Sequence, residues 1–285
     1  ALSQTKNMED VTCIGSDAGQ LAENMEGVNA LGFMAGWASL NTNTANMLGS
    51  SAGRSSSGNN VTNMIGNHAG YKSSGCTYSN IIGSSAGYES WNVSYSDIMG
   101  SEAGTNSADH TSTVMIGTMA GYNSSDCSNS NIIGSGAGYQ ASDCGDSNFI
   151  GTQAGKDAVD VDTSTALGWN SMWLASGMSM CNAIGWQAGK LASGCITTTM
   201  IGKSAGGEAA DDSGSVMIGN YAGHGSYDLE YGVLIGLNAG NQASGCEHAT
   251  IIGAAAGYEM WDSDDTIALG TYAGYQVKTA TESIF

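Results

Sequence analysis

The sequence predicts an all-β fold, a β-solenoid or β-roll of about 17 coils, and three observations support this prediction. A Gly that follows Ile, Leu or Met returns every 17 residues without insertion or deletion, from Gly15 and Gly32 to Gly270. The stretch before that Gly is only about four residues long, as in Ser79 to Ile82, which suits a short strand. A 17-residue unit is also too short to hold a helix, a strand and two loops.

Each position of the repeat has its own composition, and we call the remainder of a residue number divided by 17 its slot. Slot 14 always holds Ile, Leu or Met, so we expect it to face the coil interior. From Ala18 to Ala273, slot 1 is Ala and slot 2 is Gly in every copy except Ser171-Met172, and slot 5 is almost always Ser or Ala. Slot 7 holds Asn, Asp or Gly in nearly every coil, which predicts a corner with left-handed backbone angles.

Slot 13 is apolar and directly precedes slot 14. Neighbouring strand residues point to opposite faces, so an inward slot 14 implies an outward slot 13. An apolar stripe along the surface predicts self-association with other copies. The alternative is a local bulge that turns both slots inward. The residues that we expect to form the self-association stripe are Met64, Ile81, Ile98, Met115, Ile132 and Phe149.

The composition argues against two classes of partner. The chain has seven Lys and Arg residues and a formal net charge of -19, so it lacks the basic surface that a nucleic-acid binder needs. No run approaches the eighteen apolar residues of a membrane span. We therefore expect neither nucleic-acid binding nor a membrane span.

The phrase Asn-Ile-Ile-Gly-Ser-Ser-Ala-Gly-Tyr, with "DSNFIGTQAG" from Asp146 to Gly155, resembles the repeats of trimeric autotransporter adhesin heads and of related phage tail-fibre shafts. The resemblance implies short β coils from three chains packed around a common axis. It also implies fibres outside the cell, on a cell surface or on a virion, that bind surfaces.

The ends of the sequence fall within the repeated phrase, and neither carries an evident cap. Solenoids need polar caps to protect their terminal coils. We therefore expect residues 1–285 to form a single uncapped repeat domain, a segment of a longer fibre or a subunit that stacks end to end.

Cysteine and acidic columns give two further hypotheses. Five of the seven cysteines share slot 8 with apolar residues, which favours buried thiols, although Cys127 and Cys144 are in adjacent coils where a bridge is an alternative. A column of Asp at slot 7 suggests calcium between coils, or else solvated side chains that cap turns. The members of this column are Asp109, Asp126, Asp143 and Asp160. We expect no cofactor other than this candidate calcium.

Aromatic residues occupy slot 3 in half of the coils, which predicts a stacked ladder, with a ligand platform as the alternative. Several Trp residues gather around the broken copy of the Ala-Gly phrase. Exposed Trp stacks on sugar rings or anchors partners. The candidate glycan- or partner-binding surface comprises Trp169, Met172, Trp173 and Trp186.

Slots 9 and 11 carry alternating Ser and Thr, as in Thr77 and Ser79, and a flat hydroxyl array of this kind suggests ice binding. The four His residues lie in four different slots, and no catalytic motif accompanies them, so we expect no enzymatic activity. The favoured function is a structural fibre, filament or adhesin shaft. Ice binding or glycan binding is the alternative, and a polysaccharide-degrading fibre domain is a weaker one.

Overall fold

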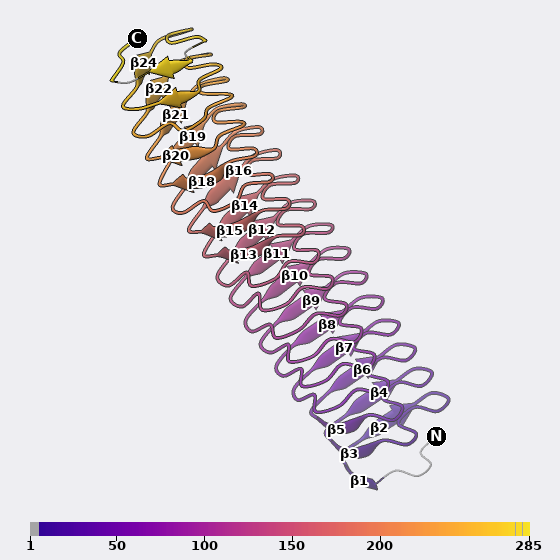
Figure 1. The fold of residues 1–285 in the computed structure, drawn as a ribbon. Helices are drawn as coiled ribbons and strands as arrows, with labels where there is room; N and C mark the ends of the chain where they lie inside the picture. The colour runs from indigo at the N-terminus through magenta and orange to yellow at the C-terminus, as the bar shows by residue number, and fades with distance from the viewer. Residues whose placement is uncertain (1–5, 277, 281) are drawn as a thin grey trace. The chain divides into compact units, whose positions relative to one another are not determined.

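The computed structural model describes residues 6–276, 278–280 and 282–285, and within them it is all-β, with no helix. The chain divides into two compact units, residues 1–141 and residues 142–285. In each unit, successive turns of the chain lie one on the next, as Figure 1 shows for strands β6 to β10. The predicted β-solenoid with a 17-residue repeat is therefore confirmed.

The main ladder of the first unit is built from slots 12 to 14. Its strands pair in parallel with partners 17 residues apart, so that Met64 lies opposite Ile81 and Ile65 lies opposite Ile82. The strands are β2 (Thr12–Ile14), β4 (Asn29–Leu31), β6 (Asn46–Leu48), β7 (Asn63–Ile65), β8 (Asn80–Ile82), β9 (Asp97–Met99), β10 (Val114–Ile116) and β11 (Asn131–Ile133).

A second parallel sheet of the first unit uses slots 6 to 9. It contains β1 (Lys6–Glu9), β3 (Glu23–Glu26) and β5 (Leu40–Asn43). Beyond β5 the same slots pair through single bridges, such as Leu40 with Ser57 and Ser57 with Ser74.

The second unit repeats both features. Its main-ladder strands are β12 (Asn148–Ile150), β14 (Thr165–Leu167), β16 (Asn182–Ile184), β17 (Thr199–Ile201), β19 (Val216–Ile218), β21 (Val233–Ile235), β22 (Thr250–Ile252) and β24 (Ile267–Leu269). Its other strands are β13 (Val159–Asp162), β15 (Ser176–Ser179), β18 (Ala210–Ser213), β20 (Asp228–Glu230), β23 (Asp262–Ser263) and β25 (Thr279–Ala280). The pairing of β18 with β20 contains a register shift between Ala210 and Ser213.

Each coil turns through residues with positive φ. The slot 7 corner is confirmed, since Asn24, Asn92 and Asp109 have φ of 54, 52 and 55°. The backbone conformation at slot 15 requires Gly, because Gly83 has a φ of 139°, a region that only Gly occupies readily. This conformation explains why slot 15 is Gly in every coil.

The core is a thin column of small and medium side chains from slots 1, 5, 8, 11 and 13. The described slot 5 residues are buried, and several of the Ser hydroxyls among them bond the backbone of slot 2. Ser73 donates to the carbonyl of Gly70 and Ser90 to that of Gly87, each at 2.9 Å. At these two residues the hydrogen bond satisfies the buried hydroxyl, whereas the buried hydroxyl of Ser56, at the same slot, has no partner among the described residues.

In the main ladder, slot 13 faces the core and slot 14 faces outward, which is the reverse of the prediction. All six residues predicted for the self-association stripe are fully buried, with 0% exposure: Met64, Ile81, Ile98, Met115, Ile132 and Phe149. Slot 14 instead points outward, and Ile65 and Ile82 are 39% and 36% exposed. The prediction that slot 13 is outward is therefore wrong. The reason is the Gly at slot 2, which leaves room for the side chain at slot 13: a Cβ on Gly70 would lie 2.5 Å from Sδ of Met64.

This contact also explains the broken copy of the Ala-Gly phrase. Met172 occupies slot 2 in place of Gly. The slot 13 residue of the same coil is the small Ala166, and that of the next coil is Ala183. Met172 is fully buried. The large side chain has thus moved from slot 13 to slot 2, which keeps the volume of the core nearly constant.

Candidate functional site

The most regular surface feature is the outer side of the main ladder, formed by slots 12 and 14, which we call the outer face. Slot 14 is exposed or half-buried in every described coil, and neighbours in the ladder lie directly opposite one another. Large aliphatic side chains therefore form a continuous column in each unit. In the first unit the column is Ile14, Leu31, Leu48, Ile65, Ile82, Met99, Ile116 and Ile133, and in the second it is Ile150, Leu167, Ile184, Ile201, Ile218, Ile235, Ile252 and Leu269.

Slot 12 lies beside this column and carries a ladder of amides in the first unit. The Nδ2 of Asn46 donates to Oδ1 of Asn63, and Asn63 donates to Asn80, both at 2.7 Å. The series ends where Asn80 donates to Oδ1 of Asp97 at 2.6 Å. Each amide satisfies the next, so the polar column beside the apolar one is held in a single register.

Charge is strongly segregated between the faces of the repeat. Asp97 is the only Asp, Glu, Lys or Arg at slots 11 to 15 anywhere in the sequence. Slots 6 to 10 hold most of the acidic residues and, among Lys and Arg, only Lys6 and Lys278. The outer face is therefore nearly neutral, in a chain whose formal net charge is -19.

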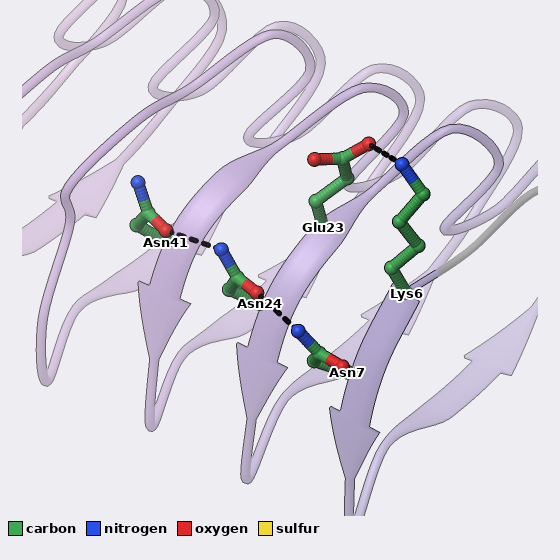
Figure 2. Close-up of polar contacts among 5 residues, drawn as sticks. All are labelled: Lys6, Asn7, Glu23, Asn24 and Asn41. Atoms are coloured by element: carbon green, nitrogen blue, oxygen red, sulfur yellow. Dashed lines mark hydrogen bonds and ion pairs between the residues drawn. The ribbon is translucent and has the colours of Figure 1, made fainter.

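Figure 2 shows the polar character of slots 6 and 7 at the start of the first unit. The amide of Asn7 donates to Asn24 at 3.1 Å, and Asn24 donates to Asn41 at 2.8 Å. Beside them, Nζ of Lys6 lies 3.4 Å from Oε1 of Glu23. This face is therefore hydrated and charged, unlike the outer face.

Aromatic residues stack at slot 3, as predicted, and also at slots 10 and 16. In every stacked pair the partners are 17 residues apart, the ring centroids are 4.9–5.7 Å apart, and the planes are within 12° of parallel. The pairs are Tyr71–Tyr88, Tyr78–Tyr95, Tyr122–Tyr139, Trp169–Trp186, Tyr231–His248 and Tyr258–Tyr275. Such stacking covers one face of each ring in a pair.

The structure divides the predicted Trp surface. Trp169 and Trp186 stack at 5.4 Å, and Nζ of Lys203 covers Trp186 at 4.5 Å from the ring centroid. Trp173 belongs to another column, where Lys190 lies 4.8 Å from its ring centroid. Met172 is part of the core and is not at the surface. The three Trp residues thus do not form one open platform.

The predicted calcium column is exposed and lies at corners. Asp109, Asp126, Asp143 and Asp160 are all exposed, and all have positive φ. Oδ1 of Asp109 accepts a hydrogen bond from Asn92 at 2.9 Å. Within the described residues, no group of three or more His, Cys, Asp or Glu side chains could hold a metal ion. The geometry agrees with the alternative hypothesis, that these Asp residues adopt and cap turns.

The predicted flat hydroxyl array does not form, because slot 11 faces the core. Ser79 is buried, and its hydroxyl donates to the carbonyl oxygens of Thr77 and Val93 at 3.0 and 2.9 Å. Thr113 is likewise buried. Strand alternation therefore assigns slot 11 with slot 13 to the interior.

Among the described residues, the slot 8 column is buried except for half-buried Met8, as predicted, and all seven cysteines of the chain are thiols. Cys13 is half-buried, and the other six cysteines are buried. Burial raises the pKa of the Cys76 thiol above its usual value. These groups pack as small apolar side chains, since a thiol with a raised pKa is a poor nucleophile.

One residue in this column was not singled out by the sequence. His110 is fully buried, and its Nδ1 accepts a hydrogen bond from the backbone N–H of Cys127 at 3.2 Å. Its Nε2 lies 3.2 Å from the carbonyl oxygen of Ser124. Burial lowers the pKa of His110, although the backbone contacts and the nearby carboxylates of Asp126 and Asp109 oppose this shift.

The parallel coils define the chain as a β-solenoid repeat protein. No protein-family model matches it, and a sequence comparison with curated proteins finds no match. The resemblance to adhesin-head and tail-fibre repeats therefore remains a hypothesis. In the part of the chain that the structure describes, no helix has the length and apolar character to cross a bilayer.

Proposed function

We propose that this chain is a structural segment of a fibre, whose copies associate with one another through the outer face. The single observation that carries the proposal is the slot 14 column, an apolar side chain that is at least partly exposed in every described coil. Monomeric proteins rarely expose a long contiguous apolar surface to water. The role is mechanical and requires no catalytic residue.

Charge supports the choice of another copy as the partner. Two chains that each carry a net charge of -19 repel one another wherever acidic faces approach. The outer face avoids this repulsion, because Asp97 is its only charged residue. Copies can therefore bring their outer faces together at the smallest electrostatic cost.

The resemblance in sequence motif supports a location of such a fibre outside the cell, on a cell surface or on a virion. It also suggests a trimer, in which three outer faces would meet around one axis. End-to-end growth into a filament is the other form that the proposal allows.

Analytical ultracentrifugation of the purified chain, over a range of concentrations, tests the proposal. The informative variant replaces Ile65, Ile116 and Ile201 together with Lys. The matched control places the same charges in the same coils at slot 10, with Val61, Ser112 and Thr197 replaced by Lys.

We expect the wild type and the control to form trimers or larger assemblies. The outer-face variant should associate at least about 100-fold more weakly, because buried like charges cost several kcal/mol. A discrete trimer favours the adhesin form, and growth with concentration favours the filament. A wild type that stays monomeric at every concentration, or an outer-face variant that assembles like the control, would overturn the proposal.

A further inference from the structure

The second unit contains a hollow that belongs to neither the outer face nor the predicted Trp surface. Its volume is about 460 Å³, and it lies over slots 3 to 6 of consecutive coils. The lining residues are Glu208, His224, Gly225, Tyr227, Asn241, Gln242, Ala243, Ser244 and Trp261. All of them belong to the second unit.

The hollow exists because one coil lacks a side chain at slot 4. Gly225, with a φ of 80°, occupies this slot between the coils that carry Glu208 and Gln242 there. Every other coil has a side chain at slot 4. Ala243, which is almost completely buried, belongs to the core at the bottom of the hollow.

Two exposed aromatic residues line the same hollow. Tyr227 and Trp261 both occupy slot 6, and they are 62% and 56% exposed. The coil between them carries Ser244 at this slot. The two aromatic residues are therefore two coils apart, with only a small side chain between them.

This arrangement differs from that of the stacked pairs. In those pairs the rings are one coil apart and cover each other's faces, as Trp169 and Trp186 do at 5.4 Å. Two coil spacings amount to about 9.6 Å. Tyr227 and Trp261 therefore leave room for one further ring, at the place where Ser244 provides none.

The width of the gap indicates the kind of ring. Atoms in van der Waals contact are about 3.5–4.0 Å apart, so a flat aromatic ring between two others needs a gap of only about 7–8 Å. A pyranose chair is puckered and thicker, and it suits a gap of about 9.6 Å better. Apolar C–H groups of a sugar pack well on aromatic faces.

The polar side chains of the hollow complement sugar hydroxyl groups. The carboxylate of Glu208 accepts hydrogen bonds, and the amides of Asn241 and Gln242 both donate and accept them. The chain has a formal net charge of -19, which disfavours an acidic sugar. A few polar groups around apolar walls are typical of small-molecule sites.

We propose that this hollow binds one neutral hexopyranose unit, held between Tyr227 and Trp261. The site lies in a single chain, so it does not depend on self-association through the outer face. It also differs from the predicted Trp surface, where ring faces are covered by stacking and by Lys203.

Saturation-transfer difference NMR of the full chain tests this proposal. The probes are the methyl glycosides of glucose, galactose and mannose, with methyl glucuronide as the acidic counterpart and indole as the flat aromatic one. We expect at least one neutral glycoside to bind with a Kd of about 1–10 mM, the range for a ligand of this size. Methyl glucuronide should bind more weakly than that glycoside.

Two variants test the geometry, and a third serves as the matched control. Trp261→Ala removes one wall, while Ser244→Tyr supplies a ring that fills the gap, as adjacent-coil rings do in the Tyr122–Tyr139 pair. Each should weaken glycoside binding at least about fivefold. Trp91→Ala, which removes an exposed Trp at the same slot 6 but in the first unit, should leave binding unchanged.

Thermal unfolding by circular dichroism verifies that the variants fold. Ser244→Tyr should unfold near the wild-type temperature, since the new ring lies in an exposed gap and displaces no core side chain. The proposal is overturned if no neutral glycoside binds the wild type, or if indole binds and the glycosides do not. It is also overturned if folded Ser244→Tyr binds as well as the wild type.

Discussion

The backbone of Gly83 faces the carbonyl oxygen of Gly100 so closely that a Cβ on Gly83 would lie 2.3 Å from that oxygen. Gly83→Ala therefore has to displace backbone in the next coil, and it also has to hold Ala at a φ of 139°. We expect it to lower the free energy of unfolding by about 3 kcal/mol or more. Urea unfolding followed by circular dichroism measures this loss.

Gly58 supplies the control for this prediction. It has a φ of 62°, the nearest backbone atom to its Cβ would be 3.8 Å away, and other coils carry Asn or Asp at the same slot. Gly58→Ala should cost only about 1 kcal/mol. Equal losses in the two variants would show that the close approach at slot 15 is not what requires Gly.

Stability should depend on pH through His110. Because burial lowers its pKa in the folded state, the unfolded chain binds a proton more readily, from about pH 6.5 downward. The stability that comes from the neutral ring is complete above pH 6.5, and it decreases as the pH falls below that value. Unfolding midpoints in urea between pH 8 and pH 5 measure the slope.

His110→Asn should flatten this dependence while keeping the fold. Asn59 occupies the same slot three coils earlier and makes equivalent bonds, since its Oδ1 accepts from the N–H of Cys76 at 2.8 Å. Its Nδ2 donates to the hydroxyl of Ser73 at 2.9 Å. If the slope between pH 6.5 and pH 5 is the same in His110→Asn, the buried imidazole is not its source.

The exchange of volume between Ala166 and Met172 predicts a compensating pair of substitutions. Met172→Gly alone leaves a cavity and should cost about 2–5 kcal/mol. Ala166→Met alone overfills the coil and should cost about 1–3 kcal/mol. The double variant restores the usual pattern of slots 13 and 2, so it should be more stable than the first single variant.

A double-mutant cycle on thermal or urea unfolding measures this coupling. An interaction energy of at least about 1 kcal/mol is expected between the two sites. Additive losses would mean that the side chains at slots 2 and 13 do not share one space.

The amide ladder should tolerate a carboxylate only at its end. Asn63→Asp can still accept from Asn46, but it can no longer donate to Asn80, so we expect a loss of about 1–2 kcal/mol. Asp97→Asn keeps the acceptor for Asn80 and should change stability by less than about 0.5 kcal/mol. Denaturant unfolding at pH 7 compares the two, and a larger loss for Asp97→Asn would contradict the direction of the ladder.

The sequence was sufficient to predict the period, the coil, the slot 7 corner and the burial of the slot 8 column. These features depend on local chemistry that recurs at a fixed spacing, such as Asp109 at a corner with positive φ. The prediction that slot 14 faces the interior was wrong. It rested on slot 14 being more uniformly aliphatic than slot 13, which is the slot that faces the core. Slot 12 carried the missing signal, since polar Asn63 and Asn80 must share a face with Ile65 and Ile82 two residues on.

The hollow in the second unit was beyond sequence reasoning for a different reason. It depends on the absence of a side chain at Gly225 and on the gap left by Ser244, and both effects arise between coils. The sequence did indicate Trp169 and Trp186 as exposed, but it did not show that their ring faces cover each other. Contacts along the stacking direction have to be seen in three dimensions.

The in-register pairing of equivalent slots makes one coil the natural unit of insertion and deletion. Removal of residues 63–79 would bring Asn80 opposite Asn46 and Ile81 opposite Met47. These pairs would replace the pairs of Asn46 with Asn63 and of Met47 with Met64, so the side chains in contact would be of the same kind. Loss of a single residue would instead put the coil that contains it out of register with its neighbours, and turn side chains of that coil to the opposite side of the strand. Genes that encode such chains can therefore change length by whole multiples of seventeen codons, while smaller changes that keep the reading frame are far more damaging.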